Sequence, residues 1–292
     1  MGRLIFRRVE IIMENMAECA KQRLQSKDCE EKNMLEQIAK IVREASELMK
    51  PENIKVEQKG NDSNYVTTAD VNVENFLKEH LLELLPGSSF VGEESDEEKA
   101  DTEYIWVVDP IDGTSNFIRN LGLSAISVGL LRDRKPYIGV VYQPYRDEMY
   151  TAKVGEGAFL NGERIHVSDR DFRHSHLCSA MSLYNKDYAP PCFRIIERVY
   201  AESDDLRRLG TAAVEMVYLA AGRVELYFEI RLFPWDVAAA IPIITEAGGY
   251  VELMFEDKLP LNRPMPVIAA NTKENFERLK EIVYEEIPER VY

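Results

Sequence analysis

Apolar residues near the start of the chain recur every three or four positions, which is the spacing of amphipathic helices. A first set comprises Ile5, Val9, Ile12, Met16 and Ala20, and a second comprises Leu35, Ile38, Ile41, Ala45 and Leu48. A third helix is expected after Asp70, and the Pro-Gly-Ser sequence at 86–88 ends it. The chain therefore opens with helices, ahead of any frequent strand signal.

The middle of the chain carries short stretches rich in β-branched and aromatic residues, separated by turn-forming residues. The predicted strands cover residues 89–91, 104–108, 123–131, 137–142 and 148–154. Asn161-Gly162 follows between two further short strands, and it predicts a tight hairpin because both central residues of a type I′ turn need positive φ. We therefore expect an antiparallel meander in this region.

After about Ser168 the pattern changes to strands and helices in alternation. Strands are predicted at 177–181, 206–209 and 224–230, and helices at 193–200, 211–221 and 234–247. Alternation of this kind indicates α/β layering. A domain boundary is therefore expected near residue 168.

Charge narrows the range of partners. The 292 residues include 36 Lys and Arg against 51 Asp and Glu, which gives a formal net charge of −15. Such a protein repels nucleic-acid phosphates and anionic lipid, so we expect neither a nucleic acid nor a membrane as partner. No apolar stretch approaches the roughly 18 residues that cross a bilayer, no signal peptide is recognisable, and the cysteines form no disulfide framework. The sequence therefore predicts a cytoplasmic protein.

The densest group of unusual residues is WVVDPIDGTSNF at 106–117. An apolar strand leads into Asp109, Pro110 interrupts the ladder and Asp112 follows, so both carboxylates emerge at one strand end. Two acids held together repel each other, and a bound cation offsets that repulsion. Gly113 allows the backbone to approach a ligand closely. A plain turn would explain Asp-Pro or Asp-Gly separately, but it does not explain the combination.

Two further junctions place an acid beside Gly, Pro or Trp. Glu93 follows a strand in FVGEES, and Asp236 stands at a helix start in PWDVAAA. An acidic loop or a helix cap would explain either residue separately, but not the recurrence. The four histidines lack zinc-ligand spacing, so a metal held here would be magnesium, manganese or calcium. The chain contains no dinucleotide fingerprint, P-loop or G-x-S-x-G elbow.

Taken together, these junctions resemble the signatures of the inositol monophosphatase family. The matching segments are VTTAD at 66–70, GEES at 92–95, DPIDGTSNF at 109–117, GTAA at 210–213, WDVA at 235–238 and TEAGG at 245–249. They follow the family's order from about residue 59 to 271. The resemblance implies a layered αβαβα sugar-phosphatase fold, of the α+β or α/β class. An α+β metal-binding domain with an antiparallel sheet would cover 49–168, a smaller α/β domain at 169–292 would complete the site, and 1–48 would be a helical extension.

The resemblance also implies a set of metal ligands. Glu93, Asp109 and the carbonyl of Ile111 match the ligands of a first magnesium ion. Asp109, Asp112 and Asp236 match those of a second, so that Asp109 would bridge the two ions. Two or three Mg²⁺ are expected in each site.

Other residues match groups that bind substrate or move a proton. Asp70 matches the residue near a weaker third ion and the attacking water, and Thr114 matches its hydroxyl partner. The amides of Gly113 and Thr114 match the phosphate-binding groups. Either Glu93 or the pair of Asp70 and Thr114 would accept the proton. The positions that match contacts to the inositol ring are Asp112, Ala212 and Glu229.

These matches imply a magnesium-dependent, lithium-sensitive phosphatase that forms a homodimer and acts on a small phosphate ester. Inositol monophosphate is the expected substrate, hydrolysed as by an inositol-1(or 4)-monophosphatase, with water activated by the metal pair. Fructose-1,6-bisphosphatase and histidinol-phosphatase members share the metal signatures and stay open as alternatives. A non-catalytic regulatory binding protein on the same fold is an alternative of another class.

Overall fold

The computed structural model describes residues 34–50, 54–58, 65–95, 101–181 and 185–290. Contacts divide the chain into residues 1–38 and 39–292. Residues 34–46 are helical, as the second apolar repeat predicts. The first predicted helix lies outside the described residues.

The larger sheet has seven strands in the order β3-β4-β5-β6-β7-β8-β9. These are β3 (Ser89–Gly92), β4 (Tyr104–Asp112), β5 (Ala125–Arg132), β6 (Lys135–Gln143), β7 (Glu148–Lys153), β8 (Gly157–Leu160) and β9 (Glu163–Arg164). β3 runs parallel to β4, and every later strand is antiparallel to the one before it. Asn161 and Gly162 have φ of 50° and 84° in the last turn, so the meander and its hairpin are confirmed.

The second sheet has five strands in the order β11-β10-β12-β14-β13. These are β10 (His176–Ala180), β11 (Asp205–Arg207), β12 (Leu226–Leu232), β13 (Tyr250–Leu253) and β14 (Met265–Ala270). β10 is parallel to β11 and β12, whereas β14 is antiparallel to β12 and β13. A separate antiparallel pair consists of β1 (Val56–Gln58) and β2 (Tyr65–Thr67). The apolar pattern predicted β10 to β12 but did not predict β13 and β14.

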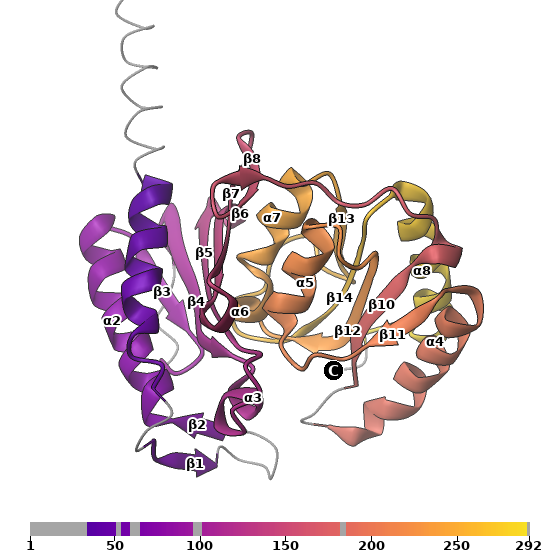
Figure 1. Ribbon diagram of the computed structural model, residues 1–292, viewed down its shortest axis with the longest axis horizontal. Helices are drawn as coiled ribbons and strands as arrows, with labels where there is room; N and C mark the ends of the chain where they lie inside the picture. Colours follow the sequence, from indigo (N-terminus) through magenta and orange to yellow (C-terminus); the bar gives the residue numbers. More distant parts are fainter. Residues whose placement is uncertain (1–33, 51–53, 59–64, 96–100, 182–184, 291–292) are drawn as a thin grey trace, which may run out of the picture. The chain divides into compact units, whose positions relative to one another are not determined.

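Helices cover both sheets and fill the space between them (Figure 1). They are α2 (Thr68–Leu84), α3 (Thr114–Ile118), α4 (Ala189–Glu202), α5 (Ala212–Ala220), α6 (Pro234–Val237), α7 (Ala240–Glu246) and α8 (Lys273–Glu286). α2 packs on the outer side of the larger sheet, α5 to α7 lie between the sheets, and α4 and α8 cover the second sheet. The αβαβα layering implied by the resemblance is thus confirmed.

The layering explains which elements are apolar on all sides. Residues 105–108 of β4 are buried in succession, because α2 packs on one face of the strand and the central helices on the other. α5 is buried around nearly its whole circumference because a sheet lies on either side of it. α4 and α8 bury only one stripe each, and their opposite faces are exposed. None of the helices that the structure describes has the length and apolar character needed to traverse a membrane.

The helix predicted at 234–247 is divided into α6 and α7, and their junction packs directly on the larger sheet. Gly129 of β5 and Gly139 of β6 are paired there. A Cβ on Gly129 would lie 2.7 Å from the Cβ of Ala238, and one on Gly139 would lie 2.0 Å from the carbonyl oxygen of Ala239. Glycine is required where two backbones approach this closely. This contact fixes the position of α6 and therefore of Asp236.

The division into domains at 49–168 and 169–292 stays a prediction, as does the helical extension at 1–48. The central helices come from the second part of the chain, yet they pack on strands from the first part. Both parts therefore contribute to the core between the sheets.

The glycine contact predicts a stability change. Gly139→Ala should lower the free energy of unfolding by about 1–3 kcal/mol, because the added methyl group meets a backbone carbonyl that cannot rotate away. Urea unfolding measures this change. Lys135→Ala, at an exposed position of the same strand, is the control and should shift stability by less than about 0.5 kcal/mol. An unchanged midpoint for Gly139→Ala would contradict the close approach.

Candidate active site

Three of the predicted carboxylates meet at one place in the folded chain. Asp109, Asp112 and Asp236 each offer an oxygen, and these oxygens all lie within 4.8 Å of one another. Asp109 and Asp112 come from the end of β4, whereas Asp236 comes from α6. The cluster therefore forms where the larger sheet meets the central helices (Figure 1).

A bulge in β4 brings its two aspartates together. Residues three apart on a regular strand face opposite sides of the sheet, so Asp109 and Asp112 would diverge. The pairing of β4 with β5 shifts register between them, at the position of Pro110, which has no N–H for the ladder. The N–H of Ile111 instead donates to Oδ1 of Asp109 at 3.0 Å. The irregular backbone thus directs both carboxylates to the same cluster.

Asp112 also connects β4 to the beginning of α5. Its Oδ2 accepts hydrogen bonds from the Thr211 hydroxyl and from the N–H of Ala213 at 2.8 Å. Its Oδ1 accepts from the N–H of Ala212 at 3.2 Å. A carboxylate at a helix N-terminus satisfies free amides and complements the helix dipole.

Asp236 is fixed in a similar way at the start of α6. Its Oδ2 accepts from the N–H of Phe233 at 2.6 Å, and Pro234 occupies the first turn of the helix. Helix capping and cluster formation are therefore compatible roles of the same side chain.

Burial and like charge act together on the cluster. Burial raises the pKa of Asp109 well above its usual value, and Glu93 followed by Asp112 and Asp236 raises it further. The pKa of Asp236 is also raised well above its usual value, first by burial and then by Asp112. Burial raises the pKa of Asp112, although its hydrogen bonds from Thr211 and the α5 amides oppose the shift. Three acids in this state favour a divalent cation, and an all-oxygen donor set fits Mg²⁺.

Glu93 lies beside this cluster without belonging to its closest three oxygens. Its N–H donates to the carbonyl of Val108 at 3.2 Å, which extends the parallel pairing of β3 with β4. Among neighbouring charges, Glu93 has the largest effect on the pKa of Asp109. The structure therefore places it next to the residue with which it was predicted to share a metal.

Asp70 and Thr114 are brought together, as the resemblance implies. Asp70 lies in the first turn of α2, where its Oδ2 accepts from the Thr67 N–H at 2.7 Å and the Thr67 hydroxyl at 2.5 Å. Its other oxygen, Oδ1, lies 3.3 Å from the Thr114 hydroxyl, which is also 3.1 Å from the carbonyl oxygen of Ile111. Burial raises the pKa of Asp70.

The predicted substrate positions border the carboxylate cluster. Gly113 has φ of 85° at the N-cap of α3, and a Cβ there would lie 3.1 Å from the Cβ of Thr211, so the two loops touch. Ala212 begins α5 and bonds to Asp112. Glu229 on β12 accepts from the Tyr227 hydroxyl at 3.0 Å, and burial followed by the charge of Glu215 raises the pKa of Glu229 to about 8.

Two residues that support the site were not among the predicted ones. The Asn116 amide nitrogen lies 2.8 Å from the carbonyl oxygen of Leu123 and 2.7 Å from that of Leu209, so it joins α3 to the turn before α5. Glu215 accepts from the N–H groups of Leu209 and Gly210 and holds the same turn from its other side. A single acid within the apolar sequence of α5 was the available signal, because a buried charge needs partners.

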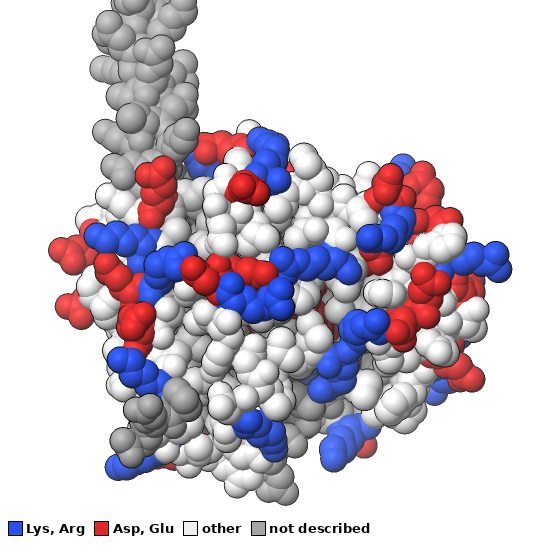
Figure 2. Space-filling model, in the orientation of Figure 1, with Lys and Arg blue, Asp and Glu red and all other residues white. Residues whose placement is uncertain are grey.

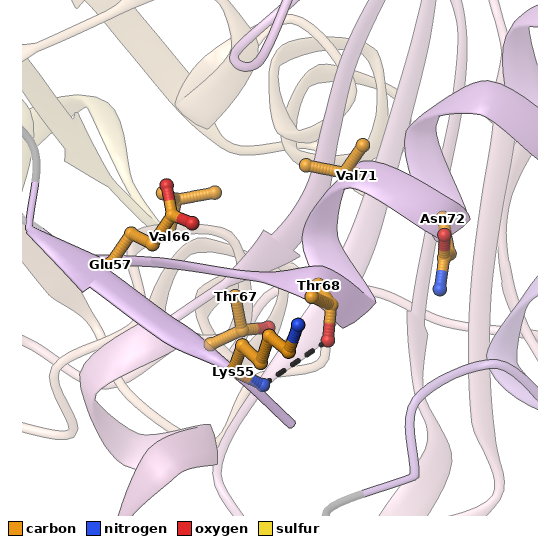
Figure 3. Close-up of a pocket in the computed structure, with 7 residues that line it drawn as sticks. All are labelled: Lys55, Glu57, Val66, Thr67, Thr68, Val71 and Asn72. Atoms are coloured by element: carbon orange, nitrogen blue, oxygen red, sulfur yellow. Dashed lines mark hydrogen bonds between the residues drawn. The ribbon is translucent and has the colours of Figure 1, made fainter. Parts of the chain in front are cut away.

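A small cavity lies outside the carboxylate cluster, between the antiparallel pair of β1 and β2 and the first turns of α2 (Figure 3). Its volume is about 150 Å³. The residues that line it are Lys55, Glu57, Val66, Thr67, Thr68, Val71 and Asn72. None of the predicted metal ligands is among them, so the cavity borders the site only through Thr67, which caps Asp70.

The electrostatics of the cluster predict how metal removal changes stability. The pKa of Asp109 is higher in the folded protein than in the unfolded chain, where it is about 3.9. The negative charge of Asp109 therefore lowers the stability of the folded protein once the pH exceeds that unfolded-state pKa. In EDTA at pH 7–8, the free energy of unfolding of Asp109→Asn, measured with urea, should therefore exceed that of wild type by about 1–3 kcal/mol. The difference should shrink towards pH 4. In saturating Mg²⁺, wild type should be more stable than Asp109→Asn, because the variant lacks one of the metal ligands.

Asp133→Asn is the control, since it removes one exposed acid from the same negative protein. A similar gain in Asp133→Asn would indicate a general charge effect. Equal stability of Asp109→Asn and wild type in EDTA would contradict the repulsion inferred for the cluster.

Sequence and fold comparisons show the family to which the chain is related. The model of the inositol monophosphatase family matches residues 25–287, more than the 59–271 over which the motifs occur. The chain is 38% identical over 203 residues to the Escherichia coli protein named Nus factor SuhB, covering 69% of this chain and 76% of that protein. It is 35% identical over 217 residues to a fructose-1,6-bisphosphatase/inositol-1-monophosphatase of Aquifex aeolicus, covering 74% of this chain and 81% of that protein.

The solved structure of extragenic suppressor protein suhB from Bartonella henselae matches with a TM-score of 0.76 and 31% identity, covering 84% of this chain and 95% of that one. The chain therefore belongs to the inositol monophosphatase family.

Proposed function

We propose that this protein is a Mg²⁺-dependent phosphomonoesterase that hydrolyses inositol monophosphate to inositol and phosphate. The observation that carries the proposal is the convergence of Asp109, Asp112 and Asp236, with Asp70 and Thr114 paired beside them. Membership of the inositol monophosphatase family supports the same reaction.

The carboxylates and one carbonyl would hold the metal. Glu93, Asp109 and the Ile111 carbonyl would bind one Mg²⁺, and Asp109, Asp112 and Asp236 would bind a second. When bound, Mg²⁺ supplies positive charge that lowers the pKa of water and offsets the charge of the phosphate. The bulge in β4 supports this assignment because it directs Asp109 and Asp112 to the same side.

The pair formed by Asp70 and Thr114 is our candidate for receiving the proton of the attacking water. Oδ2 of Asp70 is engaged by Thr67, whereas Oδ1 faces the Thr114 hydroxyl. Thr114 would take up the proton as it passes its own to Oδ1 of Asp70. Glu93 is the alternative acceptor.

The remaining residues would bind the substrate. The amides of Gly113 and Thr114 would hold the phosphate, since the positive φ of Gly113 leaves the start of α3 accessible. Asp112, Ala212 and Glu229 would contact the leaving group, and the Glu229 carboxylate can accept hydrogen bonds from ring hydroxyls.

A sugar bisphosphate, which carries a second anionic group, is an alternative substrate within the family. Histidinol phosphate is the other alternative that the shared signatures predict. Arg208 is exposed on the turn before α5, and its charge opposes the effects of burial and Glu215 on the pKa of Glu229. A cation beside the leaving-group position favours a sugar bisphosphate. The name of the Aquifex aeolicus relative, which includes fructose-1,6-bisphosphatase, supports the same alternative.

A regulatory, non-catalytic role is a candidate of another class. It is favoured by relatives such as the Escherichia coli protein, which is named a Nus factor. Retention of Glu93, Asp109, Asp112 and Asp236 favours catalysis. A catalytic protein could also carry a second role.

Family membership and sequence extend the proposal to inhibition by lithium, a homodimer and a cytoplasmic location. They also favour a small phosphate ester over a polyanion as partner. On the face shown in Figure 2, Lys and Arg side chains are interspersed with Asp and Glu, so no broad basic field covers it. The charge of −15 supports the same preference.

A substrate panel tests the reaction. Wild type should release phosphate from inositol 1-phosphate in Mg²⁺ and not in EDTA, and Asp109→Asn should lower kcat/KM by at least about 100-fold, because one change removes a ligand of both ions. Phosphate release is the measurement, with fructose 1,6-bisphosphate and histidinol phosphate as competitors. A much higher kcat/KM for either competitor would overturn the inositol assignment and leave the phosphatase intact. No release from any ester would favour the regulatory role.

Glu229 tests how the leaving group is recognised. Above pH 8, where Glu229 is ionised, Glu229→Gln should lower kcat/KM for inositol 1-phosphate about 10-fold, because the amide accepts fewer hydrogen bonds from the ring hydroxyls than the carboxylate does. It should leave hydrolysis of p-nitrophenyl phosphate, which has no such hydroxyls, within about twofold. Equal losses on both esters would show that Glu229 does not contact the inositol ring.

A further inference from the structure

We propose that Glu74 is a positioning residue that holds the loop bearing Glu93, and that it thereby sets the affinity of the first Mg²⁺ site. This proposal rests on the proposed function only in assigning Glu93 to the metal. Glu74 lies on α2 and was not among the residues predicted from the motifs.

The carboxylate of Glu74 engages the two residues that directly follow Glu93. Its Oε2 accepts from the N–H of Glu94 at 2.9 Å, and its Oε1 accepts from the hydroxyl of Ser95 at 2.5 Å. Glu74 is only 4% exposed, so these hydrogen bonds form away from bulk water. Bonds to a buried charged group are stronger than exposed ones and hold the loop in one conformation.

Gly92 makes this approach possible from the other side. A Cβ at position 92 would lie 2.3 Å from Oε2 of Glu74, so any other residue would displace the carboxylate. Gly92 pairs with Val108 of β4, and the N–H of Glu93 bonds to the carbonyl of Val108 at 3.2 Å. The main chain of Glu93 is therefore held by β4 on one side and by Glu74 on the other.

The location of Glu74 on α2 links the two edges of the site. Asp70 and Glu74 are four residues apart and so lie on one face of the helix. That face presents Asp70 to Thr114 and Glu74 to the Glu93 loop. One rigid helix thus positions both predicted proton acceptors relative to each other.

Packing alone does not account for an acid at this position. Burying a carboxylate near other acids costs free energy, and an apolar side chain of similar size would avoid that cost. The two hydrogen bonds to Glu94 and Ser95 offset part of that cost. A role through Glu93 gives this arrangement a function.

Calorimetric titration with Mg²⁺ tests the proposal directly. Glu74→Gln should raise the Kd for Mg²⁺ about 10- to 100-fold, because an amide cannot accept from both loop donors and the Glu93 loop loses its anchor. Glu79→Gln is the matched control, since it makes the same change at an exposed position of the same helix, and its Kd should stay within about twofold of wild type. A Kd for Glu74→Gln within twofold of wild type would overturn the proposal.

A double variant separates positioning from a general loss of structure. If Glu74 acts through Glu93, then Glu74→Gln combined with Glu93→Gln should bind Mg²⁺ as weakly as Glu93→Gln alone. A further 10-fold loss in the double variant would show another route and overturn the inference. Should Glu74→Gln not fold, Ser95→Ala replaces it, with an expected rise in Kd of about 3- to 10-fold and none in the background of Glu93→Gln.

The readout is independent of turnover. If wild type releases no phosphate but the Glu74 variants change the Kd for Mg²⁺ as stated, the proposed function is wrong and the role of Glu74 is supported. A wild type that hydrolyses esters while Glu74→Gln binds Mg²⁺ normally would do the reverse.

Discussion

Burial and mutual repulsion of carboxylates dominate the energetics of the site that the layers hold. Asp109 and Asp112 are 2% and 6% exposed and lie with Asp236 in one cluster, where every added negative charge raises the pKa of its neighbours. Helix N-termini offset part of this cost, since Asp112 meets the first amides of α5 and Asp236 caps α6. The remaining repulsion is the driving force for binding a divalent cation. Stability of the metal-free protein and affinity for metal are therefore opposed properties of the same cluster.

The layers hold this cluster at a fixed geometry by backbone contact. Gly129 and Gly139 allow the junction of α6 and α7 to rest on the sheet, and Gly92 allows the carboxylate of Glu74 to reach the Glu93 loop. Side chains at these positions would push apart elements that carry different ligands. A metal site tolerates displacements of only a few tenths of an ångström, so these contacts decide whether the carboxylates act together.

The metal side and the leaving-group side of the site differ in how well the sequence predicts them. Asp109, Asp112 and Asp236 lie in dense motifs, and their carboxylate oxygens lie close together in the structure. Asn116 and Glu215 act through backbone carbonyls and amides of the turn before α5. The sequence does not show which backbone groups these side chains reach, although the single acid in the apolar α5 marks Glu215 as a residue that needs partners. The elements β13, β14 and α8, which follow the last motif, were not predicted either.

The acidic junctions, the meander with its Asn161-Gly162 turn and the family resemblance could all be predicted from the residue pattern, because each depends on local residue type and spacing. The residue pattern predicted that Pro110 interrupts the ladder, but not that β4 continues through a bulge as far as Asp112. It also did not predict that the helix expected at 234–247 divides where it packs on two glycines far away in the chain. These features depend on contacts between distant segments. Only the tertiary structure brings the backbone of one layer against another, and that contact decides which carboxylates share one cation.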